Sequence, residues 1–439
     1  MSGTDSTHAL SLRSWLASAN GPGCDFPIQN LPHGVFRSSG TSERFRGGVA
    51  IGDQVLDLEG ALGLELFPEA VGDAARAASR APLNDFMALS HEERKALRAG
   101  LSALFAEGAP RQDDIRSCLI PQSNVEHALP ARIENFSDFY SSLSHATNVG
   151  ALFRPDNPVL PNYRWLPVGY TGRTSSIRVS GVDLVRPRGQ LKDPAEEVPE
   201  FAPCRRLDYE VELGILVARG NELGTPIPIR EAEAHLFGIC LLNDWSARDI
   251  QSWEYVPLGP FLAKSFFTSL SPWVVTMDAL EPYRTAFARP AGDPEPLPHL
   301  WDPSLTQRGA IDIRVQMWLQ TKRMAERRQA SALLSTSRFT DTYWALAQLV
   351  AHQTSNGSNL CPGDLLGSGT LSGPAADSLG CLLELTGGGK DPFSLPNGET
   401  RTFLEDGDTV VMTAYCEGDG KARIGFGECR TTVLAARRG

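Results

Sequence analysis

The segment Asp208-Tyr209-Glu210-Val211-Glu212-Leu213-Gly214-Ile215 alternates acidic with apolar or small residues. Side chains of a β-strand point alternately to its two faces. In such a strand the carboxylates of Asp208, Glu210 and Glu212 share one face, and the intervening apolar side chains share the other. Carboxylates on one face repel each other unless a cation lies among them. For this segment alone, a cation site and a solvated outer face are equally good interpretations.

Strand patterns continue on both sides of this segment. They occupy residues 176–185, 209–217, 272–277, 311–319, 380–385 and 409–415, and Gly-Asp or Asp-Gly dipeptides at 363–364, 406–408 and 419–420 predict turns between several of them. Helical spacing of apolar residues predicts helices at 229–237, after Asp244, and at 340–352. We therefore expect a fold that is mainly β with some α.

The N-terminal part has a different pattern. Residues 34–58 form short alternating runs that break at glycines, which predicts small antiparallel strands. Residues 70–80 and 91–105 have helical spacing, and Ser90 with Glu93 forms a capping box for the second helix. Polar residues and Pro130 follow. We place the boundary there, which predicts a smaller domain over residues 15–130 and a larger one over 131–439.

Charge, hydropathy and cysteine content limit the class of protein. The 439-residue chain has a formal net charge of −11 and no dense run of Lys and Arg, so we expect no nucleic-acid partner. Its apolar runs are far shorter than the roughly 20 residues that cross a bilayer, and the first 20 residues lack the apolar core of a signal peptide. Eight cysteines without a C-x-x-C pair predict free buried thiols. We expect a cytoplasmic protein with no membrane partner.

Two further acids strengthen the cation interpretation of the acidic strand. Asp244 ends an apolar run at a predicted strand-to-helix turn, and Asp138 lies two residues before Tyr140. Carboxylate oxygens are hard ligands, which suit Ca²⁺ or Mg²⁺ better than zinc.

The segment that follows Asp244 contains a second polar constellation. Asp244, Arg248 and Gln251 stand at positions i, i+4 and i+7, which would place them on one face of a short helix. A surface ion pair between Asp244 and Arg248 is the simpler interpretation of that spacing. Lys264 follows among apolar and small residues, where an ammonium group needs an anionic partner.

A histidine and a glutamate are candidates for proton transfer. His145 lies in a polar segment, and a single histidine is more often structural than catalytic. Glu384 is one carboxylate inside the apolar run 380–385, which we interpret as a strand, and an ionisable group there needs a partner. Orienting a histidine is a suitable role for it, although spacing does not identify which histidine.

Several motifs together resemble the fumarylacetoacetate hydrolase family. They are Asp138-Phe-Tyr140-Ser-Ser, His145-Ala-Thr-Asn-Val-Gly150, Asp208-Tyr-Glu210-Val-Glu212, residues 243–251, residues 253–261 and Gly363-Asp-Leu-Leu-Gly-Ser-Gly-Thr370. The segment Asp25-Phe-Pro-Ile-Gln-Asn-Leu-Pro-His-Gly-Val-Phe36 also resembles an N-terminal domain that only some members of the wider superfamily possess. The resemblance covers nearly the whole chain.

The resemblance implies a fold and an activity. The fold would be a small SH3-like N-terminal β-barrel and a larger C-terminal mixed β-sandwich roll, assembled as a homodimer. The activity would be the hydrolysis of a carbon–carbon bond in the β-diketone 4-fumarylacetoacetate, which gives fumarate and acetoacetate and ends tyrosine and phenylalanine breakdown through homogentisate.

The resemblance also implies roles for individual residues. The Ca²⁺ or Mg²⁺ ligands would be Asp138, Glu210, Glu212 and Asp244, with Lys264 and Thr268 close to a further ion site. The catalytic residues would be His145 as base, Glu384 as its partner, and Arg248, Gln251 and Lys264 around an oxyanion. The substrate would contact Tyr140, Arg154, Tyr170, Gln251, Tyr255 and Thr370. Ala263, Phe267 and Ser358 depart from the family pattern, which leaves the fine shape of the Lys264 loop open.

Two alternatives to this interpretation remain at the level of sequence. One is a related enolate reaction at the same site, such as acylpyruvate hydrolysis or decarboxylation of an oxaloacetate-like substrate; His145 and the N-terminal domain argue against it. The other is a non-catalytic Ca²⁺-stabilised β domain that acts as a binding module, in which Glu210 and Glu212 are structural.

Overall fold

The computed structural model describes residues 3–437 of the chain. Residues 1–2, and residues 438–439 of the expected C-terminal domain, lie outside the described residues. Within residues 3–437, no helix is both long and apolar enough to cross a membrane.

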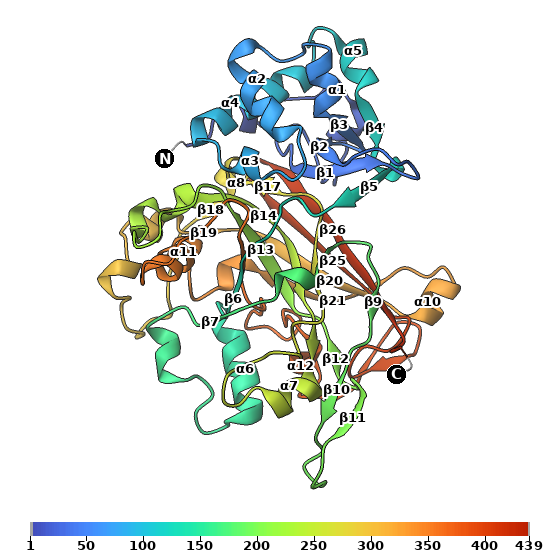
Figure 1. Ribbon diagram of the computed structural model, residues 1–439, viewed down its shortest axis with the longest axis vertical. Coiled ribbons are helices and arrows are strands. Elements are labelled where there is room, and N and C mark those ends of the chain that lie inside the picture. Colours follow the sequence, from blue (N-terminus) through green and yellow to red (C-terminus); the bar gives the residue numbers. More distant parts are fainter. Residues whose placement is uncertain (1–2, 438–439) are drawn as a thin grey trace.

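The N-terminal part contains a five-stranded antiparallel sheet with helices packed around it, at one end of the long axis of the molecule (Figure 1). In spatial order the strands are β4 (Leu119–Pro121), β3 (Gln54–Asp57), β2 (Arg46–Ile51), β1 (His33–Ser38) and β5 (Val125–Ala128). The helices are α1 (Leu58–Gly63), α2 (Glu69–Ala78), α3 (Asn84–Met87), α4 (His91–Phe105) and α5 (Gln112–Ser117). The predicted capping box is confirmed, because Ser90 and Glu93 bond reciprocally at the start of α4.

The larger part contains two extended sheets. The first has the order β7 (Gly169–Thr171), β6 (Phe136–Phe139), β22 (Leu365–Gly367), β13 (Val211–Val217), β14 (Leu236–Asp244), β16 (Thr268–Leu270) and β8 (Ile177–Val179), with β17 (Val275–Thr276) also paired to β14. The second has the order β21 (Ala332–Arg338), β20 (Arg314–Gln320), β25 (Thr409–Gly418), β26 (Lys421–Leu434) and β9 (Leu184–Val185). The mainly β core that the sequence predicts is confirmed.

Short elements complete this part. The two-stranded pairs are β10 (Arg188–Leu191) with β11 (Glu200–Pro203), β12 (Leu207–Asp208) with β15 (Ser246–Ala247), β18 (Arg284–Thr285) with β19 (Ala310–Ile311), and β23 (Phe393–Ser394) with β24 (Thr400–Arg401). The helices are α6 (Leu143–Phe153), α7 (Arg248–Glu254), α8 (Met277–Leu280), α9 (Leu305–Arg308), α10 (Lys322–Glu326), α11 (Leu346–Thr354) and α12 (Leu382–Leu385). Helices α6, α7 and α12 lie away from the N-terminal part, in the lower half of Figure 1.

Strand β13 is buried on both faces, which excludes the solvated outer face considered for the acidic segment. Leu213 and Ile215 belong to the core that includes residues of the second sheet, whereas Leu216 belongs to the core of the N-terminal part. Glu210 and Glu212 alternate onto the same face as Leu216 but lie nearer the other end of the strand. The N-terminal part and the acidic residues therefore use opposite ends of one sheet face.

Three sequence expectations need correction in this part. Residues 382–385 form helix α12 rather than a strand, because the Asp208 carboxylate accepts hydrogen bonds from the backbone N–H groups of Leu382 and Leu383 and begins a helical turn there. The helix predicted at 229–237 is a 3₁₀ helix over Ile229–His235. The helix predicted at 340–352 begins only at Leu346.

A buried arginine connects α4 to the chain's N-terminal segment. Arg98 donates to the carbonyl oxygen of Asn30 at 2.8 Å, to the hydroxyl of Thr7 at 3.0 Å and to the carbonyl of Gln29. Burial lowers the pKa of Arg98 to about 10, so the group stays charged near neutral pH. Its donors satisfy carbonyl groups that would otherwise be buried without partners.

We expect Arg98→Met to lower the free energy of unfolding by about 3 kcal/mol, because buried carbonyl oxygens lose a charged donor. Lys95→Met on the same helix removes only a partly exposed ion pair with Asp5 and should change stability by less than about 0.5 kcal/mol. Guanidinium chloride denaturation followed by circular dichroism measures both. Equal midpoints for the two variants would contradict this role of Arg98.

Candidate active site

Four carboxylates from four different places in the sequence converge at the end of the first sheet. The groups belong to Asp138 on β6, Glu210 directly before β13, Glu212 near the start of β13, and Asp244 at the end of β14. Each contributes one oxygen, and these four oxygens lie within 4.8 Å of one another. All four side chains are buried. The structure thus brings together all four residues that the resemblance gave as metal ligands, and it leaves Asp208 out of the cluster.

The cluster has the chemistry of a cation site. Asp138 Oδ1 and Glu212 Oε1 are buried and have no hydrogen-bond partner among residues 3–437. Gly367 makes room for them, because a Cβ atom at that position would lie 2.3 Å from Asp138 Oδ1. Unpaired buried carboxylate oxygens are costly, and a hard divalent ion is a suitable partner for them. The donor set therefore fits Ca²⁺ or Mg²⁺.

Crowding of the carboxylates affects their ionisation. Burial raises the pKa of Asp138 well above its usual range, and the charge of Asp244 adds to this shift. Burial also raises the pKa of Glu212, and the charge of Asp138 adds to it. Burial opposes ionisation of Glu210 as well, but the ammonium of Lys264 and the guanidinium of Arg248 outweigh it and lower the pKa of Glu210. Both shifts favour the protonated form of Asp138 and Glu212, which a bound cation would oppose.

Lys264 lies between two members of the cluster. Its ammonium group is 2.5 Å from Glu210 Oε2 and 2.7 Å from Asp244 Oδ2, so the anionic partner expected from the sequence is present. Tyr170 donates to Asp244 Oδ2 at 2.7 Å, and Thr268 donates to Asp244 Oδ1 at 3.3 Å. An ammonium group has no lone pair to offer a metal ion. Lys264 therefore balances the charge of the cluster and is not a side-chain ligand.

Arg248 has partners other than the one expected. Asp244 lies at the end of β14, and α7 begins only at Arg248, so the two residues do not share a helix face. The guanidinium of Arg248 instead pairs with Asp208 at 2.8 Å and with Glu210 at 2.7 Å. The expected surface ion pair between Asp244 and Arg248 is wrong. Gln251, one turn along α7, accepts a bond from Arg248 Nη1 at 3.2 Å, as their spacing suggested.

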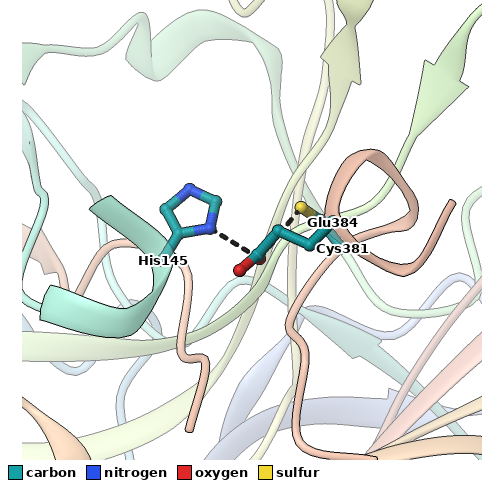
Figure 2. Close-up of side chains that lie close together, drawn as sticks. All are labelled: His145, Cys381 and Glu384. Atoms are coloured by element: carbon teal, nitrogen blue, oxygen red, sulfur yellow. Dashed lines mark hydrogen bonds and ion pairs between the residues drawn. The ribbon is translucent and has the colours of Figure 1, made fainter. Parts of the chain in front are cut away.

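His145 and Glu384 form a buried pair beside the acidic cluster. His145 lies in the first turn of α6, where Ser142 caps the helix by accepting a bond from the His145 backbone N–H. Figure 2 shows the imidazole with its Nδ1 atom turned toward the Glu384 carboxylate, and the distance to Oε2 is 2.6 Å. Burial opposes ionisation of Glu384, but the His145 ring and the hydrogen bonds from Asn148 and Ser372 outweigh it and lower the pKa to about 2. An ionised carboxylate only accepts, so Nδ1 carries the proton and Nε2 is the basic nitrogen.

The Glu384 carboxylate is held by further side chains that sequence reasoning missed. Oε2 accepts a bond from Ser372 Oγ at 2.7 Å and another from the Cys381 thiol at 3.2 Å, while Asn148 donates to Oε1 at 2.9 Å. Cys381 lies next to the carboxylate in Figure 2. Asn148 could have been found, because it is three residues after His145 and shares its face on a helix. Ser372 meets Glu384 only through the tertiary fold, and no spacing signals it.

A cavity of about 460 Å³ connects the two groups of residues. His145 lines it, as do Asp138, Glu210 and Glu212. Its lining further includes the remaining residues that the resemblance placed around substrate or oxyanion, which are Tyr140, Arg154, Tyr170, Arg248, Gln251, Tyr255, Lys264 and Thr370. Asp244, Thr268 and Glu384 are not among its lining residues. Asp244 and Thr268 line a second cavity of about 420 Å³, which shares Lys264 and Tyr170 with the first. The volume of the first cavity suits a small molecule of about the size of a dicarboxylic acid.

We expect the protein to bind Ca²⁺ with release of protons, because two carboxyl groups of raised pKa must ionise, and its affinity for the ion should fall as the pH falls. Glu212→Gln should weaken binding by at least about tenfold, because one anionic ligand is lost. Calorimetric titrations in buffers of different ionisation enthalpy measure both effects. Asp341→Asn, a half-buried carboxylate outside the cluster, is the matched control. The assignment fails if Glu212→Gln and the parent protein bind Ca²⁺ equally well.

Comparisons with known proteins find relatives that match nearly the full chain. The family model described as "Fumarylacetoacetate (FAA) hydrolase C-terminal" matches residues 135–434, and the one described as "Fumarylacetoacetase N-terminal" matches residues 29–130. The chain is 46% identical to the fumarylacetoacetase of Oryza sativa subsp. japonica over 432 residues, which cover 97% of this chain and 98% of that one. It is 48% identical to the fumarylacetoacetase of Homo sapiens, with 94% and 97% covered.

Among solved structures, the fumarylacetoacetate hydrolase of the psychrophile Exiguobacterium antarcticum is 17% identical, with a TM-score of 0.48 and coverage of 92% of this chain and 99% of that one. Both family models and the close relatives over nearly the whole length lead to one conclusion: the chain belongs to the fumarylacetoacetate hydrolase family and has the two-part organisation of its fumarylacetoacetase members.

Proposed function

We propose that this chain, by family a hydrolase of carbon–carbon bonds, cleaves 4-fumarylacetoacetate to fumarate and acetoacetate, the last step of tyrosine and phenylalanine breakdown through homogentisate. The observation that carries the proposal is the His145–Glu384 pair, which meets the carboxylate cluster across one cavity. Hydrolysis of a β-diketone needs an activated water at one carbonyl group and a place for the enolate that leaves. The two groups of residues supply these two requirements. The name that the relatives share supports the choice of substrate.

His145 activates the water. Nε2 takes a proton from water as its oxygen bonds to the carbonyl carbon of the fumaroyl group, and Glu384 stabilises the imidazolium that forms. The carbon–carbon bond next to that carbonyl then breaks, and its electron pair leaves with the acetoacetate half as an enolate. The imidazolium returns a proton to the enolate carbon, which gives acetoacetate and fumarate with all atoms accounted for.

The cation and the basic side chains stabilise negative charge. Asp138, Glu210, Glu212 and Asp244 would hold a Ca²⁺ or Mg²⁺ ion, which when bound supplies Lewis-acid stabilisation to the diketone oxygens. Arg248 faces the same cavity, and its buried Nη2 atom has no partner among residues 3–437. That donor, together with the Gln251 amide, is available to an oxyanion, and a donor in such a position can be worth about 3 kcal/mol of barrier.

A direct assay tests the proposal. Purified protein with Ca²⁺ or Mg²⁺ should abolish the ultraviolet absorbance of fumarylacetoacetate and release fumarate and acetoacetate in equal amounts. A chelator should stop the reaction, and His145→Ala is the inactive control. A stable diketone absorbance in the presence of metal-loaded protein would refute the proposed substrate.

We expect Glu384→Gln to lower kcat by about 10³- to 10⁴-fold, with KM changed by less than about threefold. The amide can donate to Nδ1, which favours the tautomer that carries its proton on Nε2 and has no basic nitrogen facing the cavity. Steady-state kinetics measure the effect, and circular dichroism checks the fold. A loss of substrate affinity as large as the loss of turnover would instead indicate a structural role.

We further propose that the protein is a cytoplasmic homodimer. All eight cysteines are free thiols, which are typical of a reducing compartment. The segment after α7 exposes several large apolar side chains, among them Leu258, which is 96% exposed, and Phe261, which is 60% exposed. Contiguous apolar side chains at a surface are typical of a contact between subunits. A second copy of this chain is the partner that the family resemblance implies.

Leu258→Asp should shift the protein toward monomers, because each protomer loses roughly 2 kcal/mol of apolar burial, and the loss from two protomers weakens dimerisation by about a thousandfold. Leu223, which is 79% exposed and lies outside this segment, provides the control Leu223→Asp. Sedimentation equilibrium measures both variants. A monomeric parent protein, or a Leu258→Asp variant as dimeric as the parent, would contradict the proposed interface.

A further inference from the structure

The cations that line the cavity fall into two groups. Arg154, Arg206, Arg248 and Lys264 all contribute to the lining. Arg248 is neutralised by Asp208 and Glu210, and Lys264 by Glu210 and Asp244. These two basic groups are committed to carboxylates of the protein. They leave little charge for a carboxylate of a ligand.

The other two cations are not neutralised. Among residues 3–437, the guanidinium of Arg206 has no hydrogen-bond or ion-pair partner. The guanidinium of Arg154 donates only to the carbonyl oxygen of Pro158, at 3.2 Å. Both side chains are exposed at the cavity. An arginine fork without a partner at the mouth of a small-molecule cavity is suited to bidentate binding of a carboxylate.

The proposed substrate has two carboxylates, one at each end, with the diketone in the middle. When the diketone lies at the acidic cluster, the two ends extend in opposite directions. His145 lies in the first turn of α6 and Arg154 is its C-terminal cap residue. We therefore place the carbonyl that the activated water attacks and the fumaroyl carboxylate on that side. Arg206 comes from a different place, directly before β12, and its carbonyl oxygen accepts a bond from the backbone N–H of Arg248 at the start of α7.

We propose that Arg206 forms a second carboxylate subsite, which binds the carboxylate of the acetoacetate half and thereby selects diketones that are charged at both ends. This subsite rests on the proposed function. It pairs each free cation of the cavity with one end of the substrate: Arg154 with the fumaroyl end and Arg206 with the acetoacetate end. The diketone is thus placed between two fixed points, with its attacked carbonyl near His145.

Product binding tests the subsite without any need for turnover. Calorimetric titration of the Ca²⁺-loaded protein with acetoacetate and with fumarate should show that each of two arginine variants loses affinity for a different product. Arg206→Gln should weaken acetoacetate binding about tenfold and change fumarate binding by less than about twofold, because one charge-assisted contact is lost. Arg154→Gln should do the opposite. Arg206→Lys keeps the charge but not the fork and should fall between Arg206→Gln and the parent.

A neighbouring arginine gives the matched control. Arg205 is exposed, pairs with Glu200 and does not line the cavity, so Arg205→Gln should bind both products as the parent does. Kinetics add a second readout: Arg206→Gln should raise KM for fumarylacetoacetate about tenfold but leave KM unchanged for an analogue that ends in a methyl ketone.

Equal losses for both products in Arg206→Gln, or no loss for either, would overturn the subsite. If each arginine variant loses affinity for a different product but the metal-loaded parent does not cleave fumarylacetoacetate, the result would instead refute the proposed function and leave the subsite standing. The two failures are therefore distinguishable.

Discussion

The burial of five carboxyl groups around the ends of β13 and β14 is the constraint on which the site depends. Asp208 and the four members of the cluster are all buried, and within the described part of the chain the buried basic side chains paired with them are Arg248 and Lys264. An isolated carboxylate in such surroundings costs several kcal/mol. One arginine and one lysine charge cannot neutralise five carboxylates. Burial raises the pKa of Asp138 and of Glu212, and the charges of neighbouring carboxylates add to both shifts. A divalent ion would remove that excess of negative charge, which connects the stability of the site to its occupancy.

Asp208 links this charge balance to the His145–Glu384 pair. One of its oxygens pairs with Arg248, and both oxygens accept backbone N–H groups at the start of α12. That helix carries Glu384, which in turn orients His145. Asp208, the remaining carboxylate of the acidic segment, therefore supports the His145–Glu384 pair and lies outside the four-carboxylate cluster. The acidic side chains of residues 208–212 thus contribute to both the carboxylate cluster and the support of the His145–Glu384 pair.

The sequence predicted the site best where the alternation of residue types matches the positions that the fold assigns to them. Alternation along β13 placed Glu210 and Glu212 on one face, and resemblance added Asp138 and Asp244, which the fold brings to the same point. Alternation could not tell a buried face from a solvated one, because that depends on the elements packed above it. Local spacing also failed where a distant carboxylate decided the structure. Asp208 starts α12 within a run of apolar residues that otherwise suits a strand. Arg248 forms its ion pair with Asp208 instead of with Asp244, which is nearer in sequence.

Burial on both faces of β13 fixes the register of the strand and therefore the face to which its acidic side chains point. Strand β13 pairs with β14 from Val211 opposite Asn243 to Val217 opposite Leu236, and a slip of one residue would exchange its two faces. Leu213 and Ile215 would leave the core shared with the second sheet, and Glu212 would enter it without a partner. The N-terminal part adds to this penalty because it packs against Leu216 on the face that carries the acids. Apolar packing at one end of the strand therefore fixes the side to which the carboxylates point at the other end. The smaller domain supports the position of the acidic cluster in this way, although none of its described residues lines the cavity.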